Sequence, residues 1–257
     1  MITLYNRLLE ATGDKPKNIF LPPTEADLTD RAKQRIVVIA NKLKKQGVLN
    51  ADGSYDFKGD VDISKLGLKS ITELGIKFGR VGGGFYCNNN KLTNLEGAPS
   101  KVGRDFDCSS NELISLEGAP QEVGGYFDCD YNKLTSLKGA PQEVGSGFYC
   151  SHNQLTNLEG APQEVGRGFY CDYNKLTNLE GAPSKVGGFN CSHNQLTSLE
   201  GAPSKVGGYF DCRHNQLTNL EGAPQEVGRG FYCSHNKVGF SKDDVRKVSN
   251  VKGEIIT

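Results

Sequence analysis

Apolar and polar positions recur along this chain with a fixed period, and cysteine marks that period most plainly. Successive cysteines are 21 residues apart, except for one interval of 20. Aligned on cysteine, the units read F-x-C-x-x-N-x-L-T-x-L-x-G-A-P-x-x-V-G at most positions. Self-similarity at such a spacing is typical of repeat architectures. The cysteines are Cys87, Cys108, Cys129, Cys150, Cys171, Cys191, Cys212 and Cys233.

Phenylalanine and cysteine stand two residues apart in every unit, and this spacing predicts a strand. Side chains two apart on an extended strand point to the same side, which we expect to be the core. A unit of 21 residues is too short to bury its own apolar face, so neighbouring units have to stack. The asparagine three residues after each cysteine predicts a buried ladder, with its amide bonding to the backbone of its own turn and of the next repeat. The Gly-Ala-Pro step predicts a turn.

The repeated sequence resembles that of leucine-rich repeat proteins. The stretch V-G-x-x-F-x-C-x-x-N-x-L overlays the family pattern L-x-x-L-x-L-x-x-N-x-L, with Phe and Cys in the second and third leucine positions. The short unit with its proline resembles the bacterial variety of 20–21 residues, and the resemblance covers residues 57–240. It implies an α/β-type repeat solenoid with parallel strands on the concave face, turns on the convex side and a helical cap at the N-terminus.

A narrower resemblance concerns proteins encoded by tailed bacteriophages. The phrase N-K-L-T-x-L-x-G-A-P and the Phe-x-Cys strands are similar to repeats of such proteins, and the opening L-Y-N-R-L-L-E is similar to their N-terminal segment. This resemblance implies a host protein as the partner, and modulation of host physiology or defence as the role.

The positions at which the repeat pattern begins and ends predict four segments of the chain. We expect a helical N-terminal cap in residues 1–56, a degenerate entry repeat in 57–84, a solenoid of eight Phe-x-Cys strands in 85–236 and a C-terminal cap in 237–257. Apolar residues at helical spacing predict an amphipathic helix over residues 25–46. Ile2, Tyr5, Leu8 and Leu9 indicate a shorter helix before it. Residues 241–244 predict a helix start, and the final V-K-G-E-I-I-T predicts a short edge strand.

Charge and hydropathy narrow the classes of function. Basic and acidic residues number 30 each, and a formal net charge of zero argues against a general nucleic-acid binder. The longest aliphatic run, Ile36 to Ala40, is far shorter than the ~20 apolar residues of a membrane helix. The opening residues show no apolar region typical of a secretory signal. We therefore expect a cytoplasmic protein that binds neither nucleic acid nor membrane.

The exposed side of the stacked strands is the expected binding surface. With Phe counted as position zero, positions +1, +3 and +4 carry most of the tyrosines and all four histidines, whereas the turn positions repeat Thr, Glu, Gly, Ala and Pro. Tyrosine is favoured at interfaces because it offers a large contact area and a hydroxyl group. The alternative to a binding role is that repeat duplication copied these residues and that their strand propensity retains them. The predicted partner-binding residues are Tyr86, Asp107, Asp128, Tyr131, Tyr149, His152, Tyr170, Tyr173, His193, Asp211, Arg213, His214, Tyr232 and His235.

The charge of this surface is predicted to be mildly acidic, which disfavours nucleic acid. Six aspartates face four arginines: Asp105, Asp107, Asp128, Asp130, Asp172 and Asp211 against Arg104, Arg167, Arg213 and Arg229.

Cysteine and histidine raise the question of metal and redox chemistry. Parallel Cβ vectors on neighbouring strands do not suit disulfides, and one Cys per repeat does not match zinc-site spacing, so we predict free thiols in the core. His193, His214 and His235 follow each other in one column, with rings expected about 5 Å apart. Without a carboxylate or Cys fixed nearby, polar decoration is favoured over metal binding, and we expect no cofactor. An open sheet neither excludes water nor preorganises an acid–base pair, so we expect no enzyme.

The function predicted from the sequence is non-catalytic recognition of a protein through the concave Tyr/Asp/His face. Two alternatives stay open. One is a structural or virion-associated protein that docks through residues 1–50, where nine basic residues outnumber five acidic ones. The other is metal or small-ligand binding at the histidine column.

Overall fold

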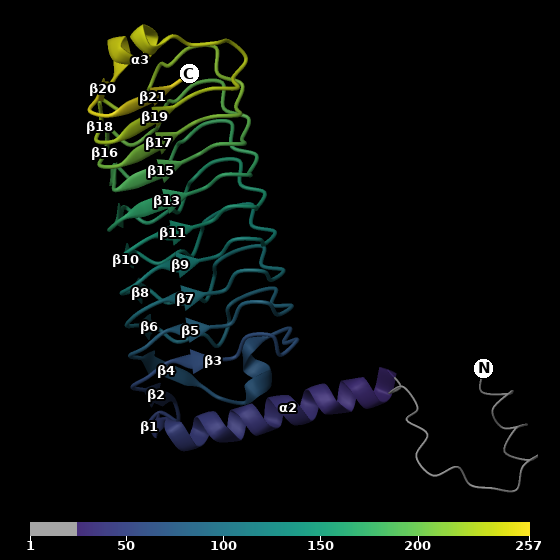
Figure 1. The fold of residues 1–257 in the computed structure, drawn as a ribbon. Coiled ribbons are helices and arrows are strands. Elements are labelled where there is room, and N and C mark those ends of the chain that lie inside the picture. Colours follow the sequence, from purple (N-terminus) through teal and green to yellow (C-terminus); the bar gives the residue numbers. More distant parts are fainter. Residues whose placement is uncertain (1–24) are drawn as a thin grey trace, which may run out of the picture. The chain divides into compact units, whose positions relative to one another are not determined.

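Short parallel strands from every repeat stack into two sheets in the computed structural model, which describes residues 25–257 (Figure 1). The chain divides into two compact units, residues 1–34 and 35–257, and all of the repeats lie in the second. The predicted short helix around residues 2–9 lies outside the described residues.

The eight Phe-x-Cys segments, with one strand of the entry repeat and one C-terminal strand, form a ten-stranded parallel sheet, called here the Phe sheet. Equivalent residues pair directly, so Phe148 lies beside Phe127 on one side and Phe169 on the other. The strands are β3 (Val61–Asp62), β5 (Phe85–Tyr86), β7 (Phe106–Asp107), β9 (Phe127–Asp128), β11 (Phe148–Tyr149), β13 (Gly168–Tyr170), β15 (Gly188–Asn190), β17 (Tyr209–Asp211), β19 (Gly230–Tyr232) and β21 (Glu254–Ile256).

A second sheet, called here the Val sheet, has eleven strands and was not predicted from the sequence. Most of its strands consist of one Lys or Glu followed by one buried Val, and all its pairings are parallel except that of β1 with β2. The strands are β1 (Val48–Leu49), β2 (Tyr55–Phe57), β4 (Phe78–Val81), β6 (Lys101–Val102), β8 (Glu122–Val123), β10 (Glu143–Val144), β12 (Glu164–Val165), β14 (Lys185–Val186), β16 (Lys205–Val206), β18 (Glu226–Val227) and β20 (Asn250–Val251).

The core lies behind the two sheets and is built from the same few residues in each repeat. The Phe, Cys and Leu columns are almost fully buried, as predicted. From Phe85 to Phe210 the phenyl rings stack with centroids 5.2–5.9 Å apart and interplanar angles of 6–13°. All eight cysteines are free and buried. Burying one such aromatic side chain contributes about 1.5–3 kcal/mol, repeated once per turn.

The asparagine column forms a buried ladder, but it joins each repeat to the preceding one rather than to the next. Asn132 Nδ2 donates to the carbonyl of Cys129 in its own repeat and to that of Cys108 in the repeat before, both at 3.1 Å. Its Oδ1 accepts from the backbone N–H of Leu113, also in the repeat before, at 3.0 Å. Each asparagine therefore satisfies backbone groups that the sheets leave unpaired.

Glycine is required where successive repeats touch. A Cβ atom on Gly124 would overlap the carbonyl oxygen of Gly103 in the preceding repeat. Gly139, in the Gly-Ala-Pro turn, has a φ of +88°, and a Cβ there would lie 2.7 Å from the backbone of Leu116. These positions explain why glycine recurs in every repeat.

Helices and short strands lie at both ends of the stack. Helix α2 (Glu25–Gln46) occupies the predicted range, and within the second unit its Ala40 and Leu43 pack into the core. In the entry repeat Val61 pairs with Phe85, and the short helix η1 (Ile71–Leu74) follows. Helix α3 (Lys242–Val248) begins with a capping box formed by Ser241 and Asp244. The last residues supply a strand to each sheet rather than the single one expected. Within residues 25–257 there is no helix that is long and apolar enough to cross a membrane.

Candidate functional site

The +1 residues lie on the outward side of the Phe sheet, called here the strand face. Tyr86, Asp107, Asp128, Tyr149, Tyr170 and Tyr232 are half-buried there. The rings of Tyr149 and Tyr170 stack with centroids 4.8 Å apart, and Tyr126 meets Tyr149 edge-on at 6.0 Å. These tyrosines form a continuous, partly exposed aromatic surface over β9, β11 and β13.

Two aspartates of the third repeat carry negative charge into this surface. Asp128 Oδ1 accepts from the backbone N–H of Asp130 at 2.9 Å, and Asp130 Oδ1 accepts from that of Ser151 at 2.6 Å. Burial and the charge of Asp107 raise the pKa of Asp128 to about 6. Burial and the charge of Asp128 raise the pKa of Asp130 to about 7. Within residues 30–257 no Lys, Arg or His forms an ion pair with either carboxylate.

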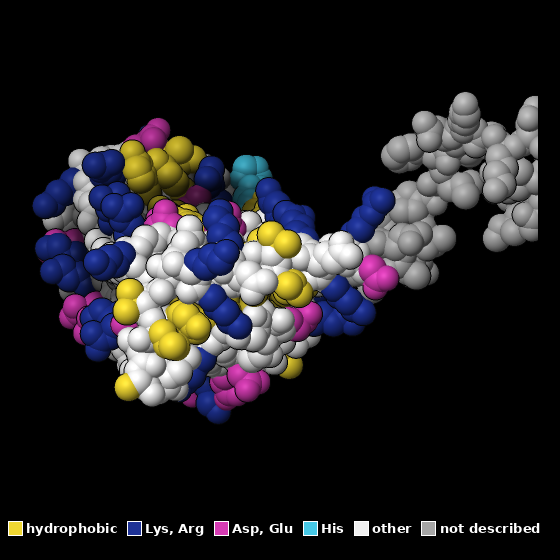
Figure 2. All heavy atoms as spheres, turned by 90° about the horizontal axis from the view of Figure 1, so that it is seen from below, with side chains coloured by type: hydrophobic (Ala, Val, Ile, Leu, Met, Phe, Trp, Pro, Cys, Tyr) yellow, Lys and Arg dark blue, Asp and Glu magenta, His cyan; other side chains and the backbone are white. Residues whose placement is uncertain are grey.

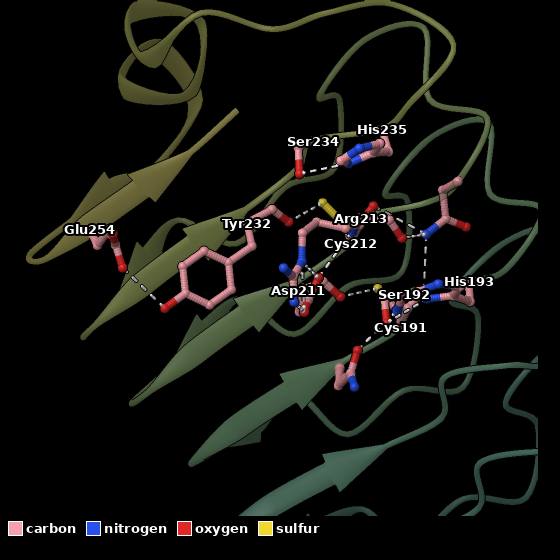
Figure 3. Close-up of polar contacts among 12 residues, drawn as sticks. Cys191, Ser192, His193, Asp211, Cys212, Arg213, Tyr232, Ser234, His235 and Glu254 are labelled. Carbon is pink, nitrogen blue, oxygen red and sulfur yellow. Dashed lines mark hydrogen bonds and ion pairs between the residues drawn. The ribbon is translucent and has the colours of Figure 1, made fainter.

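In the seventh repeat the equivalent aspartate is already paired. Arg213 Nε donates to both carboxylate oxygens of Asp211 at 3.0 and 3.1 Å, and its Nη2 donates to Oδ2 at 2.6 Å. The guanidinium carbon lies 5.3 Å from the ring centroid of Tyr232. Figure 3 shows Asp211, Arg213 and Tyr232 together. The hydrogen bond to Asp211 raises the pKa of Arg213. Asp211, predicted as an exposed contact residue, is therefore buried, with 9% of its surface exposed.

The +4 residues form a second column beyond the ends of the strands. Tyr131, His152, Tyr173, His193, His214 and His235 all have left-handed backbone conformations, with φ between 53° and 58°. Their rings stack in order with centroids 4.1–4.4 Å apart. We call this set the ring column. Each residue sits in a turn rather than on a strand, so the ring column borders the strand face instead of belonging to it.

Stacking decides what the histidines of the ring column can do chemically. Neighbouring imidazoles lie nearly parallel, at 13–25° between His193, His214 and His235, so their nitrogens do not converge on one point. Within residues 30–257 no group of three or more His, Cys, Asp or Glu is arranged to hold a metal ion. Partial desolvation between the rings, together with the charges of His193 and His235, lowers the pKa of His214.

The cysteines are placed for packing rather than for chemistry. Cys129 Sγ donates to the carbonyl of Tyr149 in the next repeat at 3.1 Å, and most of the other thiols make the equivalent bond. Burial raises the pKa of every thiol, and only that of Cys233, in the last full repeat, stays as low as about 11. These thiols are therefore protonated and poorly nucleophilic at neutral pH.

A hollow lies elsewhere, on the outside of the Val sheet. It is a shallow groove of about 870 Å³ that follows strands β6 to β16. Its charged lining residues are Lys101, Glu122, Glu143, Glu164, Lys185 and Lys205, and Lys101 forms an ion pair with Glu122. Sequence analysis missed this groove because two-residue strands leave no alternating pattern to detect.

Of the fourteen predicted contact residues, the structure brings two groups together. Six are the +1 residues of the strand face and six are the ring column, while Asp211 and Arg213 bind each other. Asp130 and Tyr126 were not in the predicted set, although both line the strand face beside Asp128. A signal for Tyr126 exists in the sequence, because Y-F-D-C occurs twice, at residues 126–129 and 209–212, and Asp130 is one of the six aspartates that the sequence places on this surface.

Comparison with known proteins gives matches among solved structures alone. No protein-family model matches the sequence. No curated protein matches it either. The leucine-rich repeat domain of a Shigella effector is similar over 99% of this chain and 98% of its own, with 16% identity and a TM-score of 0.48. YopM from Yersinia enterocolitica WA-314 is similar over 93% of this chain and 69% of its own, with 16% identity and a TM-score of 0.35. YopM, a leucine-rich effector protein from Yersinia pestis, covers 92% of this chain and 77% of its own, with 16% identity and a TM-score of 0.43.

The predicted repeat class is confirmed by the geometry of the chain itself. A period of 20–21 residues, one parallel Phe-x-Cys strand per unit and a buried asparagine after each strand are the features of a short bacterial-type leucine-rich repeat. A fold of this kind is shared by proteins with many functions.

Proposed function

We propose that this protein is a non-catalytic module that binds another protein through the strand face and the bordering ring column. The observation that supports this proposal is where the repeats differ. Exposed turn positions such as Thr135, Thr156 and Thr177 are the same in repeat after repeat, although burial does not constrain them. The +1, +3 and +4 positions change between Tyr, Asp, Asn, Ser, Arg and His on an otherwise constant frame.

Tyrosines on a rigid sheet suit recognition physically. The backbone of the Phe sheet is fixed by pairing on both sides, so the side chains of Tyr149 and Tyr170 lose little further freedom on binding. Nine steps between ten strands, at about 4.8 Å each, give a face that is long enough for an interface of standard size. The likeness of the repeats to those of bacteriophage proteins favours a host protein, met in the bacterial cytoplasm, as the partner.

The test compares two variants altered in the same repeats but on different sheets. Tyr149→Ala/Tyr170→Ala/Asp128→Ala changes the strand face, and Glu143→Ala/Glu164→Ala/Lys185→Ala changes the Val sheet. Both are expected to fold like the wild type, as checked by circular dichroism. A partner captured from bacterial lysate, then purified, is expected to lose affinity for the first variant and to keep it for the second. Equal binding by both variants contradicts the proposal.

A second candidate function is docking to a larger assembly through the N-terminal end of the stack. Val37, Val38, Val48 and Leu49 lie at this end, and between 56% and 66% of the surface of each is exposed. Figure 2, a view from this end, shows separate hydrophobic patches among basic side chains. Val38→Ser/Leu49→Ser is expected to abolish this kind of association while leaving the strand face intact. Association is measured by co-sedimentation. If it survives this change, docking through these exposed hydrophobic residues is excluded.

A further inference from the structure

Two repeats have the same sequence on the strand face except at one position. The third and seventh repeats both read Gly-Tyr-Phe-Asp-Cys, in residues 125–129 and 208–212, and each is followed by a repeat that reads Gly-Phe-Tyr-Cys. Asp128 therefore pairs in register with Tyr149 as Asp211 pairs with Tyr232. The +3 residue differs, because it is Asp130 in the third repeat and Arg213 in the seventh.

The seventh repeat shows how this surface holds a guanidinium group. Arg213 binds the Asp211 carboxylate through Nε and Nη2 and lies over the ring of Tyr232 (Figure 3). A carboxylate and an aromatic ring on neighbouring strands thus form a two-sided site, and the planar guanidinium fits both.

The third repeat offers the same two groups to solvent. A backbone bond from the +3 residue orients the carboxylate in both repeats, from Asp130 N to Asp128 Oδ1 at 2.9 Å and from Arg213 N to Asp211 Oδ1 at 3.1 Å. No Lys or Arg among residues 30–257 forms an ion pair with Asp128 or Asp130. The two tyrosines also differ, since Tyr126 stands edge-on to Tyr149 at 86°, whereas Tyr209 and Tyr232 are stacked at 22°.

We propose that Asp128, Asp130 and Tyr149 form a binding site for an arginine side chain of the partner protein, and that Arg213 fills the equivalent site in the seventh repeat. This inference rests on the proposed function, because it names the chemistry of the partner at the strand face. The third repeat supplies two carboxylates where the seventh supplies one, so a cation from outside meets more negative charge there than Arg213 does.

Arginine fits this site better than lysine does. The two contacts made by Arg213 need a planar, forked donor that lies flat on a ring, and an ammonium group provides neither property. Binding of a cation also favours the ionised forms of both carboxylates. Burial and the charge of Asp107 raise the pKa of Asp128, and burial and the charge of Asp128 raise the pKa of Asp130. Binding therefore releases protons, and affinity is expected to increase between about pH 6 and about pH 8. The charged and titratable groups that face the site are Asp107, Asp172, Tyr126, Tyr149, Tyr170 and Arg167.

The test uses two small probes, acetyl-Gly-Arg-Gly-amide and acetyl-Gly-Lys-Gly-amide, titrated into the full chain and followed by NMR. The arginine probe is expected to shift the ring signals of Tyr149 and the carboxyl signal of Asp128, and to bind about five-fold more tightly than the lysine probe. Equal affinities for the two probes, or shifts that do not include these residues, overturn the proposal.

Three variants identify the site. Asp130→Arg rebuilds the arrangement of the seventh repeat and is expected to abolish probe binding, whereas Asp130→Ser removes a charge without filling the site and is expected to weaken binding only a few-fold. Arg213→Ser is expected to create a second site, seen as new shifts at Asp211 and Tyr232. Binding that survives Asp130→Arg, or Arg213→Ser without a second site, contradicts the proposal. If Asp130→Arg does not fold, Arg213→Ser alone decides.

The probe experiment needs no partner, so its failure and that of the proposed function can be distinguished. If a captured partner depends on Tyr149 and Tyr170 but binds Asp130→Arg as well as the wild type, the arginine site is wrong and the protein-binding face stands. If the arginine probe binds as expected but the strand-face variant captures the partner as well as the wild type does, the protein-binding proposal fails instead.

Discussion

Replacing Asn153 by alanine tests whether the asparagine ladder holds neighbouring repeats together. Its Nδ2 donates to the carbonyls of Cys129, Cys150 and Ser151 at 3.0–3.2 Å, and its Oδ1 accepts from Leu134 N–H at 3.0 Å. Only 8% of the residue is exposed, so water does not replace these bonds easily. Each net hydrogen bond contributes about 1 kcal/mol, and a buried group left without a partner costs about 1–3 kcal/mol. We expect Asn153→Ala to lower the free energy of unfolding by about 3–5 kcal/mol.

The matched control lies in the same repeat. Asn157 accepts one bond from the backbone N–H of Glu159 at 3.0 Å, in an exposed turn. Asn157→Ala is chemically the same change, but it removes one bond that water can replace, so we expect a loss of about 0.5–1 kcal/mol.

Urea unfolding followed by circular dichroism measures both losses, and hydrogen exchange reports on the ladder locally. In Asn153→Ala the amide of Leu134 is expected to lose protection more than amides three repeats away, because contacts in a repeat array extend to nearest neighbours. A loss of less than about 1 kcal/mol for Asn153→Ala, or one equal to that of Asn157→Ala, would refute the ladder as a main source of stability.

Three further predictions follow from the packing and the charges. Gly124→Ala is expected to lower the melting temperature strongly because its Cβ would overlap the backbone of Gly103, whereas Gly59→Ala, with nothing within 4 Å, is expected to change it little; similar shifts in the two variants would contradict the close contact. In the native protein a thiol reagent is expected to modify Cys233 first and the other seven cysteines only on unfolding, because the pKa of Cys233, about 11, is raised less than theirs. Mass spectrometry measures the modification, and rapid modification of all eight cysteines would be inconsistent with their burial. Because the folded state raises the pKa of Asp130 to about 7, it holds a proton that the unfolded chain releases near pH 4, so stability is expected to fall as pH rises from about 4 to about 7. Asp130→Asn is expected to reduce this fall in urea midpoint, and an unchanged pH dependence would argue against the raised pKa.

Much of the fold was predictable because the same core residues recur in every repeat. A Phe and a Cys two residues apart in every unit leave one arrangement that buries both, and the structure has it from Phe85 to Cys233. The Val sheet was not predictable in the same way. Its strands are two residues long, and the feature that makes them pair is the close approach of glycines such as Gly103 and Gly124, which depends on the stack being formed already.

The candidate site was predictable as a set of columns but not as a set of contacts. Position in the repeat was sufficient to place Tyr149 and Tyr170 side by side. It was not sufficient to show that Asp211 is buried by Arg213, because that depends on the direction taken by a long side chain. The left-handed turns under the ring column were also missed, since Tyr rarely adopts this conformation, although Asn89 and the four histidines belong to residue types that are enriched in it.

The direction of the asparagine ladder has a consequence for synthesis on the ribosome. Each asparagine completes the backbone of the repeat made before it, as Asn132 does for Leu113 and Cys108. A repeat that has just emerged therefore meets a folded template and brings with it the side chain that locks the two together. Growth from the N-terminal end can add one coil at a time, at a pace set by translation, and each new coil supplies the asparagine that completes the backbone of the coil before it.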